Sequence, residues 1–421
     1  MKIKMIYTLM MILLLSACEK EVIEYVDVPG PTETIIETVT ETVTITETVT
    51  DTVTVTEVVP FPPDSYSFTR EGLSTVSYGG QTARVKMAQE LASALNDPSF
   101  TSTQLDAMFN DGTGFTDASL DESGKTIGSK VSSYGSATVK PMFDAFITDV
   151  TENVFPAVNA DPVVLASAGV AGRYTDAGGS NRTVYVNGKG LEINQAFTKG
   201  IIGGMAADQI ISGYLSASKL DGGTNVEDNN NGVYAYTAGG ATENNATKME
   251  HYWDEGFGYL YGLEPNPAYP QLGYGVLLNK YLKKVDASDE PGIADVIYNA
   301  FKLGRAAIVA QNYELRDEQA AIVKVNLSKV IGYKAAYYLR SGATEITSGN
   351  WANAFHALSE GYGFIISLQF GRKADGITPY MTNAEVNTML DALMEGNGFW
   401  DITPDALNAL ADQVDAATGL N

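Results

Sequence analysis

The sequence is poor in the residues that most often carry nucleophilic and soft-metal chemistry. Its 421 residues include a single cysteine and two histidines. These numbers exclude a disulfide-built fold and a cysteine-rich zinc protein. Basic residues are also scarce, with 27 Lys and Arg against 51 Asp and Glu and a net charge of −24. Nucleic acids reward clustered Lys and Arg, so we expect no nucleic-acid partner.

Long apolar runs are missing except near the N-terminus. Two lysines precede an apolar stretch over residues 5–15, which is too short to span a membrane and is typical of an export signal. The stretch ends in Leu-Ser-Ala-Cys18, which resembles the lipobox of bacterial lipoproteins, whose cysteine is acylated, for instance with palmitate. We therefore expect residues 1–17 to be a lipoprotein signal peptide and Cys18 to carry the lipid. The alternative is a cysteine that merely follows a secretory signal.

Residues 18–64 have the composition of a tether. From Thr38 to Thr56 every even-numbered position is Thr, and the positions between are aliphatic or acidic. This period of two favours extended backbone, but neither face is a continuous apolar surface. We expect a lipidated, extended tether rich in Thr, Val and Glu, with pairing to a second copy or to a partner's sheet edge as the alternative. The lipid would anchor the protein in the outer membrane, facing the periplasm or the cell surface.

Residues 65–421 form an acidic body with 24 basic and 40 acidic side chains. Apolar positions recur there at spacings of three and four, which predicts helices and an all-α bundle. The segments with this spacing are 84–95, 141–154, 191–217, 247–262, 293–339, 351–370, 384–393 and 404–416. Residues 183–186 are the best candidate for a short strand, and 220–247 is a loop rich in Gly and Asn.

Both histidines lie in the same local sequence. The pattern His-x-x-x-Glu-Gly-aromatic-Gly-aromatic runs from His251 to Tyr259 and again from His356 to Phe364. Agreement by accident at the five fixed positions after a histidine has a probability of roughly 10⁻⁵, so we interpret the pattern as an internal duplication. A duplicated bundle would place the two motifs in facing, pseudo-symmetric positions.

Within each motif the histidine and the glutamate lie one turn apart on one face of a helix, where both can bind one ion. Two such pairs supply two nitrogens and two oxygens, a set that suits iron or zinc. The predicted ligands are His251, Glu255, His356 and Glu360. Further candidates, as ligands or as hydrogen-bond partners of ligands, are Glu250, Asp254 and Asp208.

The motif also has a structural interpretation. A buried histidine bonded to a glutamate one turn away satisfies two polar groups in a core, and the glycines would then permit tight helix crossings. Glu192 and Asp208 lie on the apolar segment 191–217, where a buried acid requires a partner. The sequence has no His-Glu-x-x-His, nucleophile elbow or phosphate loop, so we expect binding rather than catalysis.

Several blocks carry a resemblance to known families. They are the lipobox, the acidic tether, the segment from His251 to Tyr259, Lys199-Gly200 with Asp208-Gln209, and Gly304-Arg305-Ala306-Ala307. Together they resemble a bacterial lipoprotein family without an assigned activity, domain of unknown function 4856. More distantly, the helical body with a His/Glu pair is similar to the imelysin-like proteins, iron-regulated helical proteins of the outer membrane or periplasm. Their motif is Gly-x-His-x-x-Glu, whereas here Met249 stands at the glycine position and the spacing is His-x-x-x-Glu.

The resemblance implies an imelysin-like, internally duplicated bundle and the handling of iron or haem. Our first hypothesis is therefore an outer-membrane lipoprotein that binds a metal or a metal-containing ligand, in iron acquisition. The alternative is a non-catalytic scaffold that binds another envelope protein, with the His/Glu pairs as core hydrogen bonds. A third hypothesis, a metallopeptidase, requires an open coordination position and a general base, for which Asp254 would be the candidate.

Overall fold

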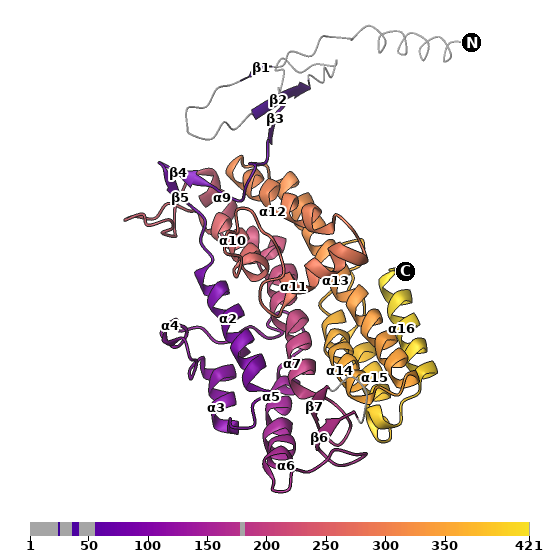
Figure 1. Ribbon diagram of the computed structural model, residues 1–421. Coiled ribbons are helices and arrows are strands. Elements are labelled where there is room, and N and C mark those ends of the chain that lie inside the picture. Colours follow the sequence, from indigo (N-terminus) through magenta and orange to yellow (C-terminus); the bar gives the residue numbers. More distant parts are fainter. Residues whose placement is uncertain (1–23, 26–35, 42–54, 177–181, 421) are drawn as a thin grey trace, which may run out of the picture.

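The computed structural model describes residues 24–25, 36–41, 55–176 and 182–420. Cys18 and the predicted signal peptide lie outside these ranges, as does most of the predicted tether. The parts of the tether that are described are strands β1 (Glu24–Tyr25), β2 (Ile36–Glu41) and β3 (Val55–Pro60). They form one antiparallel sheet in the order β1-β2-β3. Figure 1 shows this sheet beside one end of the helical body.

The body is built almost entirely from helices, which confirms the predicted all-α class (Figure 1). The α-helices are α2 (Gly79–Ala94), α3 (Ser102–Asp106), α4 (Ala118–Asp121), α5 (Val139–Asp149), α6 (Phe155–Asn159), α7 (Ile193–Ile201), α8 (Ala217–Leu220), α9 (Asn225–Asn230), α10 (Lys248–Tyr261), α11 (Leu278–Ser288), α12 (Ile293–Val309), α13 (Tyr313–Thr347), α14 (Trp351–Leu368), α15 (Asn383–Leu393) and α16 (Pro404–Thr418). The π-helical segments are η1 (Ala107–Asp111), η3 (Val150–Val154) and η4 (Ile202–Tyr214), and the 3₁₀ turns are η2 (Gly128–Lys130) and η5 (Gly398–Trp400).

Two small hairpins accompany the helices. Strands β4 (Thr69–Arg70) and β5 (Leu73–Ser74) pair near the start of the body, and β6 (Gly172–Thr175) pairs with β7 (Thr183–Val186). The prediction of a strand over 183–186 is thereby confirmed. The polar segment 220–247 is mostly loop, but it contains the short helix α9.

The segment 293–339, expected to be one continuous helical stretch, forms two helices. The chain breaks between α12 and α13 because Gln311 adopts a positive φ of 60°. Asn312 then caps α13 by accepting a hydrogen bond from the Leu315 N–H at 3.0 Å. Helix α11 was not among the predicted segments, although Leu278, Tyr281, Leu282 and Val285 have helical spacing and are all buried.

The helix that carries the first motif starts where its sequence specifies. Thr247 precedes α10, and its hydroxyl accepts from the Glu250 N–H at 3.3 Å. The Glu250 carboxylate accepts in turn from the Thr247 N–H at 2.7 Å, which completes a capping box. This cap fixes the first turn of α10, so that His251 and Glu255 follow at defined positions on the helix.

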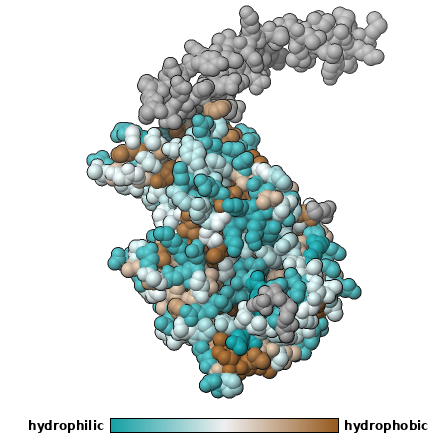
Figure 2. Space-filling model, in the orientation of Figure 1, coloured by the Kyte–Doolittle hydropathy of each residue, from teal (hydrophilic) through white to brown (hydrophobic). Residues whose placement is uncertain are grey.

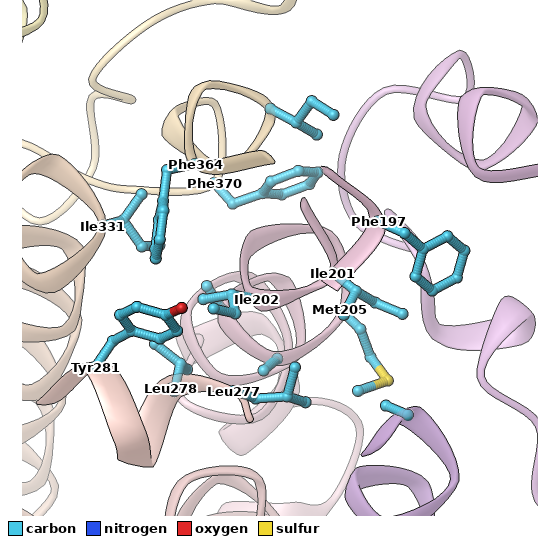
Figure 3. Packing of buried hydrophobic residues seen from close by; sticks show 14 of the residues in the cluster. Phe197, Ile201, Ile202, Met205, Leu277, Leu278, Tyr281, Ile331, Phe364 and Phe370 are labelled. Carbon is cyan, nitrogen blue, oxygen red and sulfur yellow. The ribbon is translucent and has the colours of Figure 1, made fainter. Parts of the chain in front are cut away.

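The core is centred on α7 and its continuation η4. Figure 3 shows side chains of this segment, such as Ile202, beside Tyr281 of α11, Ile331 of α13 and Phe364 of α14. By contrast, the face of the body visible in Figure 2 is mostly hydrophilic, with only small hydrophobic areas. None of the helices in the described ranges is both long enough and apolar enough to cross a membrane.

Candidate functional site

The second motif lies on α14 and builds a polar cluster with α7 and α11. The Nδ1 of His356 lies 2.7 Å from a carboxylate oxygen of Glu192, at the start of α7. Its Nε2 lies 4.0 Å from Oε2 of Glu360. The other oxygen of Glu360 accepts from the Lys199 ammonium at 2.9 Å and from the Tyr281 hydroxyl at 3.0 Å. The histidine therefore has a carboxylate near each of its nitrogens.

The charges of this cluster stabilise one another. Burial alone would raise the pKa of the Glu360 carboxyl, but Lys199 and His356 outweigh burial and lower that pKa to about 2. Burial lowers the pKa of the Lys199 ammonium, although Glu360 opposes the shift. Glu360 is thus ionised at neutral pH. The His356 side chain remains 23% exposed, so a ligand from solvent can reach it.

The first motif lies on α10 and has a different environment. Glu255 accepts from the Gln81 side-chain amide at 2.6 Å and from the Tyr214 hydroxyl at 3.2 Å. The Nε2 of His251 lies 3.8 Å from Oε2 of Glu255, close to the separation in the second motif. However, no carboxylate in the described ranges bonds the Nδ1 of His251. The ring instead stacks on Tyr236 with 3.7 Å between ring centres.

Burial also distinguishes the first histidine electrostatically. It lowers the pKa of His251, although Glu255 opposes the shift, so the imidazole is neutral at pH 7. The stacking on Tyr236 fits a packing role for this ring. The two motifs therefore keep the same His–Glu separation and differ in what surrounds the histidine.

The glycines of both motifs explain how a second helix comes so close. A methyl group at Gly363 would lie 2.6 Å from Cβ of Lys199, and one at Gly258 would lie 3.1 Å from Cβ of Gln81. Lys199 and Gln81 are also the residues that donate to the motif glutamates. Helices α7 and α2 are thus equivalent partners of α14 and α10. The interpretation that the glycines permit tight helix crossings is confirmed.

A third helix completes the equivalence. Two residues after each motif histidine, a large side chain packs onto a glycine of a neighbouring helix. Trp253 of α10 contacts the position of Gly304 on α12, and Leu358 of α14 contacts the position of Gly342 on α13. The first motif helix α10 therefore packs on α2 and α12, and the second motif helix α14 packs in a similar way on α7 and α13.

The helical body matches a known protein family. A family model described as a domain of unknown function, DUF4856, matches residues 63–421. The chain belongs to the DUF4856 family. No curated protein and no solved structure matches it. Membership of the DUF4856 family assigns no chemistry to the body, so the chemistry depends on the residues at each site.

The structure does not gather the four predicted ligands of this DUF4856 protein around one point. Each histidine lies beside its own glutamate. In the described ranges, no three His, Cys, Asp or Glu side chains form a group that could hold a metal ion. Glu255 and Glu360 each already accept hydrogen bonds from two other side chains. Metal binding stays a prediction, and a metal would contact one His–Glu pair rather than both.

Two of the further candidates, Glu250 and Asp254, belong to a buried ion network instead. The guanidinium of Arg305, fully buried, donates to Glu250 at 2.9 Å and to Asp254 at 3.1 Å. Tyr66 and Arg70, from the first residues of the body, also donate to these carboxylates. Burial alone would raise the pKa of Glu250, but the two arginines lower it to about 2. The network ties the start of the body to α10 and α12.

Asp208, the last candidate, lies on η4 away from both histidines. Its Oδ2 accepts from the Tyr134 N–H at 3.0 Å, and its Oδ1 has no hydrogen-bond partner. Burial raises the pKa of Asp208 to about 6, against the opposing effects of the Tyr134 N–H and of Arg372. The structure thus gives Asp208 a backbone partner rather than a motif histidine.

The sequence did contain the signal for one important partner. Glu192 stood out as an acid on an apolar segment that needed compensation, and His356 supplies it. The sequence did not assign Lys199 and Tyr281 to the site. They lie on other helices than the motif, and spacing within a helix does not show which residues of another helix it contacts. Only the packing of α7 and α11 against α14 brings them to Glu360.

Proposed function

We propose that this DUF4856 protein is an outer-membrane lipoprotein that binds a metal-containing ligand at the second motif, in iron acquisition. The observation that supports the proposal most is the contact between Glu192 and the Nδ1 of His356, at 2.7 Å. Metal-binding histidines are commonly held by a carboxylate on one nitrogen while the other nitrogen binds the metal. The lipobox that ends at Cys18 supports the location.

The remaining ligand atoms lie slightly farther apart than a tetrahedral metal would hold them. The Nε2 of His356 and Oε2 of Glu360 lie 4.0 Å apart. Bonds of about 2.1 Å at a tetrahedral angle hold nitrogen and oxygen ligands about 3.4 Å apart, so a small rotation of these side chains would let one ion contact both atoms. Lys199 occupies the other oxygen of Glu360. Two protein ligands leave most coordination positions open, which favours a metal that arrives with ligands of its own over a bare ion.

A scaffold function is the second candidate, and the first motif favours it. Glu255 is satisfied by Gln81 and Tyr214, and the neutral His251 stacks on Tyr236. These contacts satisfy the Glu255 carboxylate and pack the His251 ring, although the buried Nδ1 of His251 has no hydrogen-bond partner among the described residues. If the second motif served the same purpose, the His/Glu pairs would be core hydrogen bonds and the surface would carry the function.

The test is metal retention by the full-length protein, purified in detergent without chelator and incubated with ferric citrate, iron(II) or zinc. We expect about one bound metal per chain in the parent and none in His356→Gln. The Glu192→Gln variant should bind about 10 to 100 times more weakly, because it loses the group that orients the imidazole.

The matched control is His251→Gln, which alters the equivalent histidine of the first motif. It should retain the metal. A parent protein that stays free of metal under all three conditions would refute the proposal and leave the scaffold function. Loss of metal in His251→Gln with retention in His356→Gln would move the site to the first motif.

A further inference from the structure

Cationic side chains gather around the first motif although the body as a whole is acidic. Lys130 of η2 and Lys219 of α8 have their ammonium groups 6.0 and 5.9 Å from the centre of the Tyr214 ring. Arg84 of α2 and Lys125 lie within electrostatic reach of Lys130. These four cationic residues, which we call the basic cluster, come from α2, η2, α8 and the loop before η2.

The basic cluster lacks the carboxylate partners that other cations of the body have. None of its four residues forms an ion pair within the described ranges, and Arg84 donates to the Thr126 carbonyl at 3.1 Å. By contrast, the buried cations Arg305, Arg316 and Lys334 are all paired with acids. A body with more acids than bases could have supplied partners here, so their absence from these four residues needs an explanation.

The carboxylate of Glu255 acts on the basic cluster but does not balance its charge. It interacts with Lys130 through space and supplies one negative charge against four positive ones. The pKa of Lys130 is lowered, first by burial and then by the other three cations. Crowding several charges of one sign in a half-buried place costs stability in the free protein. An anion that binds among them removes this cost.

The walls of the basic cluster are suited to a small ligand with several acceptors. The Lys219 ammonium lies 4.2 Å from the centre of the Tyr252 ring. The stacked rings of His251 and Tyr236 lie beside this part of α10. Lysine and arginine side chains and tyrosine hydroxyls are donors that carboxylate and phosphate oxygens accept well.

We propose that the basic cluster is a binding site for a small multivalent anion that carries carboxylate or phosphate groups. Arg84, Lys125, Lys130 and Lys219 supply the positive charge, and the tyrosines line the site. This site is separate from the metal site proposed at His356 and does not depend on it. It assigns a ligand to the first motif, whose own His–Glu pair is structural.

The experiment is calorimetric titration of the full-length protein in detergent with citrate and, separately, with pyrophosphate. Both probes are metal-free, so a failure of the metal proposal does not affect the result. We expect binding of at least one probe, weakened at high salt because the contacts are ionic. Comparison of the two probes distinguishes a carboxylate ligand from a phosphate ligand. The Lys130→Met/Lys219→Met variant should bind at least tenfold more weakly.

Stability separates a binding role from a structural one. Without ligand, the double variant should melt at the same temperature as the parent or higher, because it removes repelling charges. The control Lys86→Met removes an exposed charge from the same helix as Arg84 and should not alter binding. The single variant Lys219→Met, expected to lose binding partially, serves if the double variant does not fold. The proposal is overturned if neither probe binds the parent, or if the lysine variants bind as tightly as it does.

Discussion

At the scale of single residues, the described part of the chain buries many charges and pairs more than half of them with charges of opposite sign. Arg305 is surrounded by Glu250, Asp254 and the hydroxyl of Thr75. Such a network contributes more to specificity than to stability, but removing one member leaves an uncompensated charge in the core. Glu250 and Asp254 are therefore explained by the fold, and they need no ligand. Asp208 is different, because one of its oxygens is left without a partner.

We expect Asp208 to make the stability of the protein depend on pH. Its pKa is about 6 in the folded state and 3.8 in the unfolded chain, so the folded state holds the proton more tightly. The free energy of unfolding should therefore fall as the pH rises from about 4 to 6, by on the order of 3 kcal/mol from this group. Asp208→Asn should lose this dependence.

Denaturant unfolding of both proteins at pH 4, 5, 6 and 7 provides the measurement. The free energy of unfolding of the Asn variant should rise relative to that of the parent as the pH rises, and the difference should level off above pH 6. A difference that stays constant over this range would show that Asp208 titrates at its ordinary pKa.

At the scale of helices, the sequence predicted well where many helices lie along the chain, but it predicted poorly which helices contact each other. The apolar spacing identified α5, α10, α14, α15 and α16. Helices α5, α15 and α16 each bury one face, whereas every residue of α14 from Ala357 to Leu368 is buried. It did not predict the break before Asn312, since a positive φ at Gln311 has no apolar signature. Nor could it place Lys199 against Glu360, because the contact depends on how α7 crosses α14 and not on spacing within either helix.

The crossing of α7 and α14 should depend on one glycine of the motif and not on the other. A methyl group at Gly363 would lie 2.5 Å from the Ala196 carbonyl oxygen and 2.7 Å from the Gly200 nitrogen, both rigid backbone atoms. Gly363→Ala should therefore force the helices apart and destabilise the protein by about 2 to 4 kcal/mol.

Gly361→Ala is the matched control on the same helix, two residues earlier. Its methyl group would lie 3.3 Å from Cβ of Tyr338, a contact that a shift of α13 by a few tenths of an ångström relieves. Alanine also favours the helix by up to about 1 kcal/mol, so the net change should stay within about 1 kcal/mol of zero. Equal destabilisation by both substitutions in denaturant unfolding would contradict the assignment of the close contact to Gly363.

At the scale of the whole molecule, the helices that pack around the two motifs are interleaved along the chain. Their order is α2, α7, α10, α12, α13 and α14, so α7, which packs on the second motif helix, lies between α2 and α10 of the first motif. The sequence suggested a duplication but not this order, because only the two short motifs retain visible similarity. The partner helices α2 and α7 make equivalent contacts with the motif helices, but their sequences show little similarity to each other.

Interleaving predicts that the body cannot be divided into two independent halves. The exposed turn at Pro291–Gly292 separates α10 from α12 and α7 from both α13 and α14. A fragment of residues 292–421 would keep α14 but lose the surface of α7 that covers Gly363. We expect this fragment to show no cooperative thermal transition and to be digested rapidly by protease.

The control is the full chain cut by a protease at a recognition site engineered into this turn. It should stay folded, since both fragments are then present and all helix contacts are retained. If the isolated fragment instead melted cooperatively near the temperature of the intact chain, residues 292–421 would be a self-sufficient bundle, and the contacts between α7 and α14 would be dispensable.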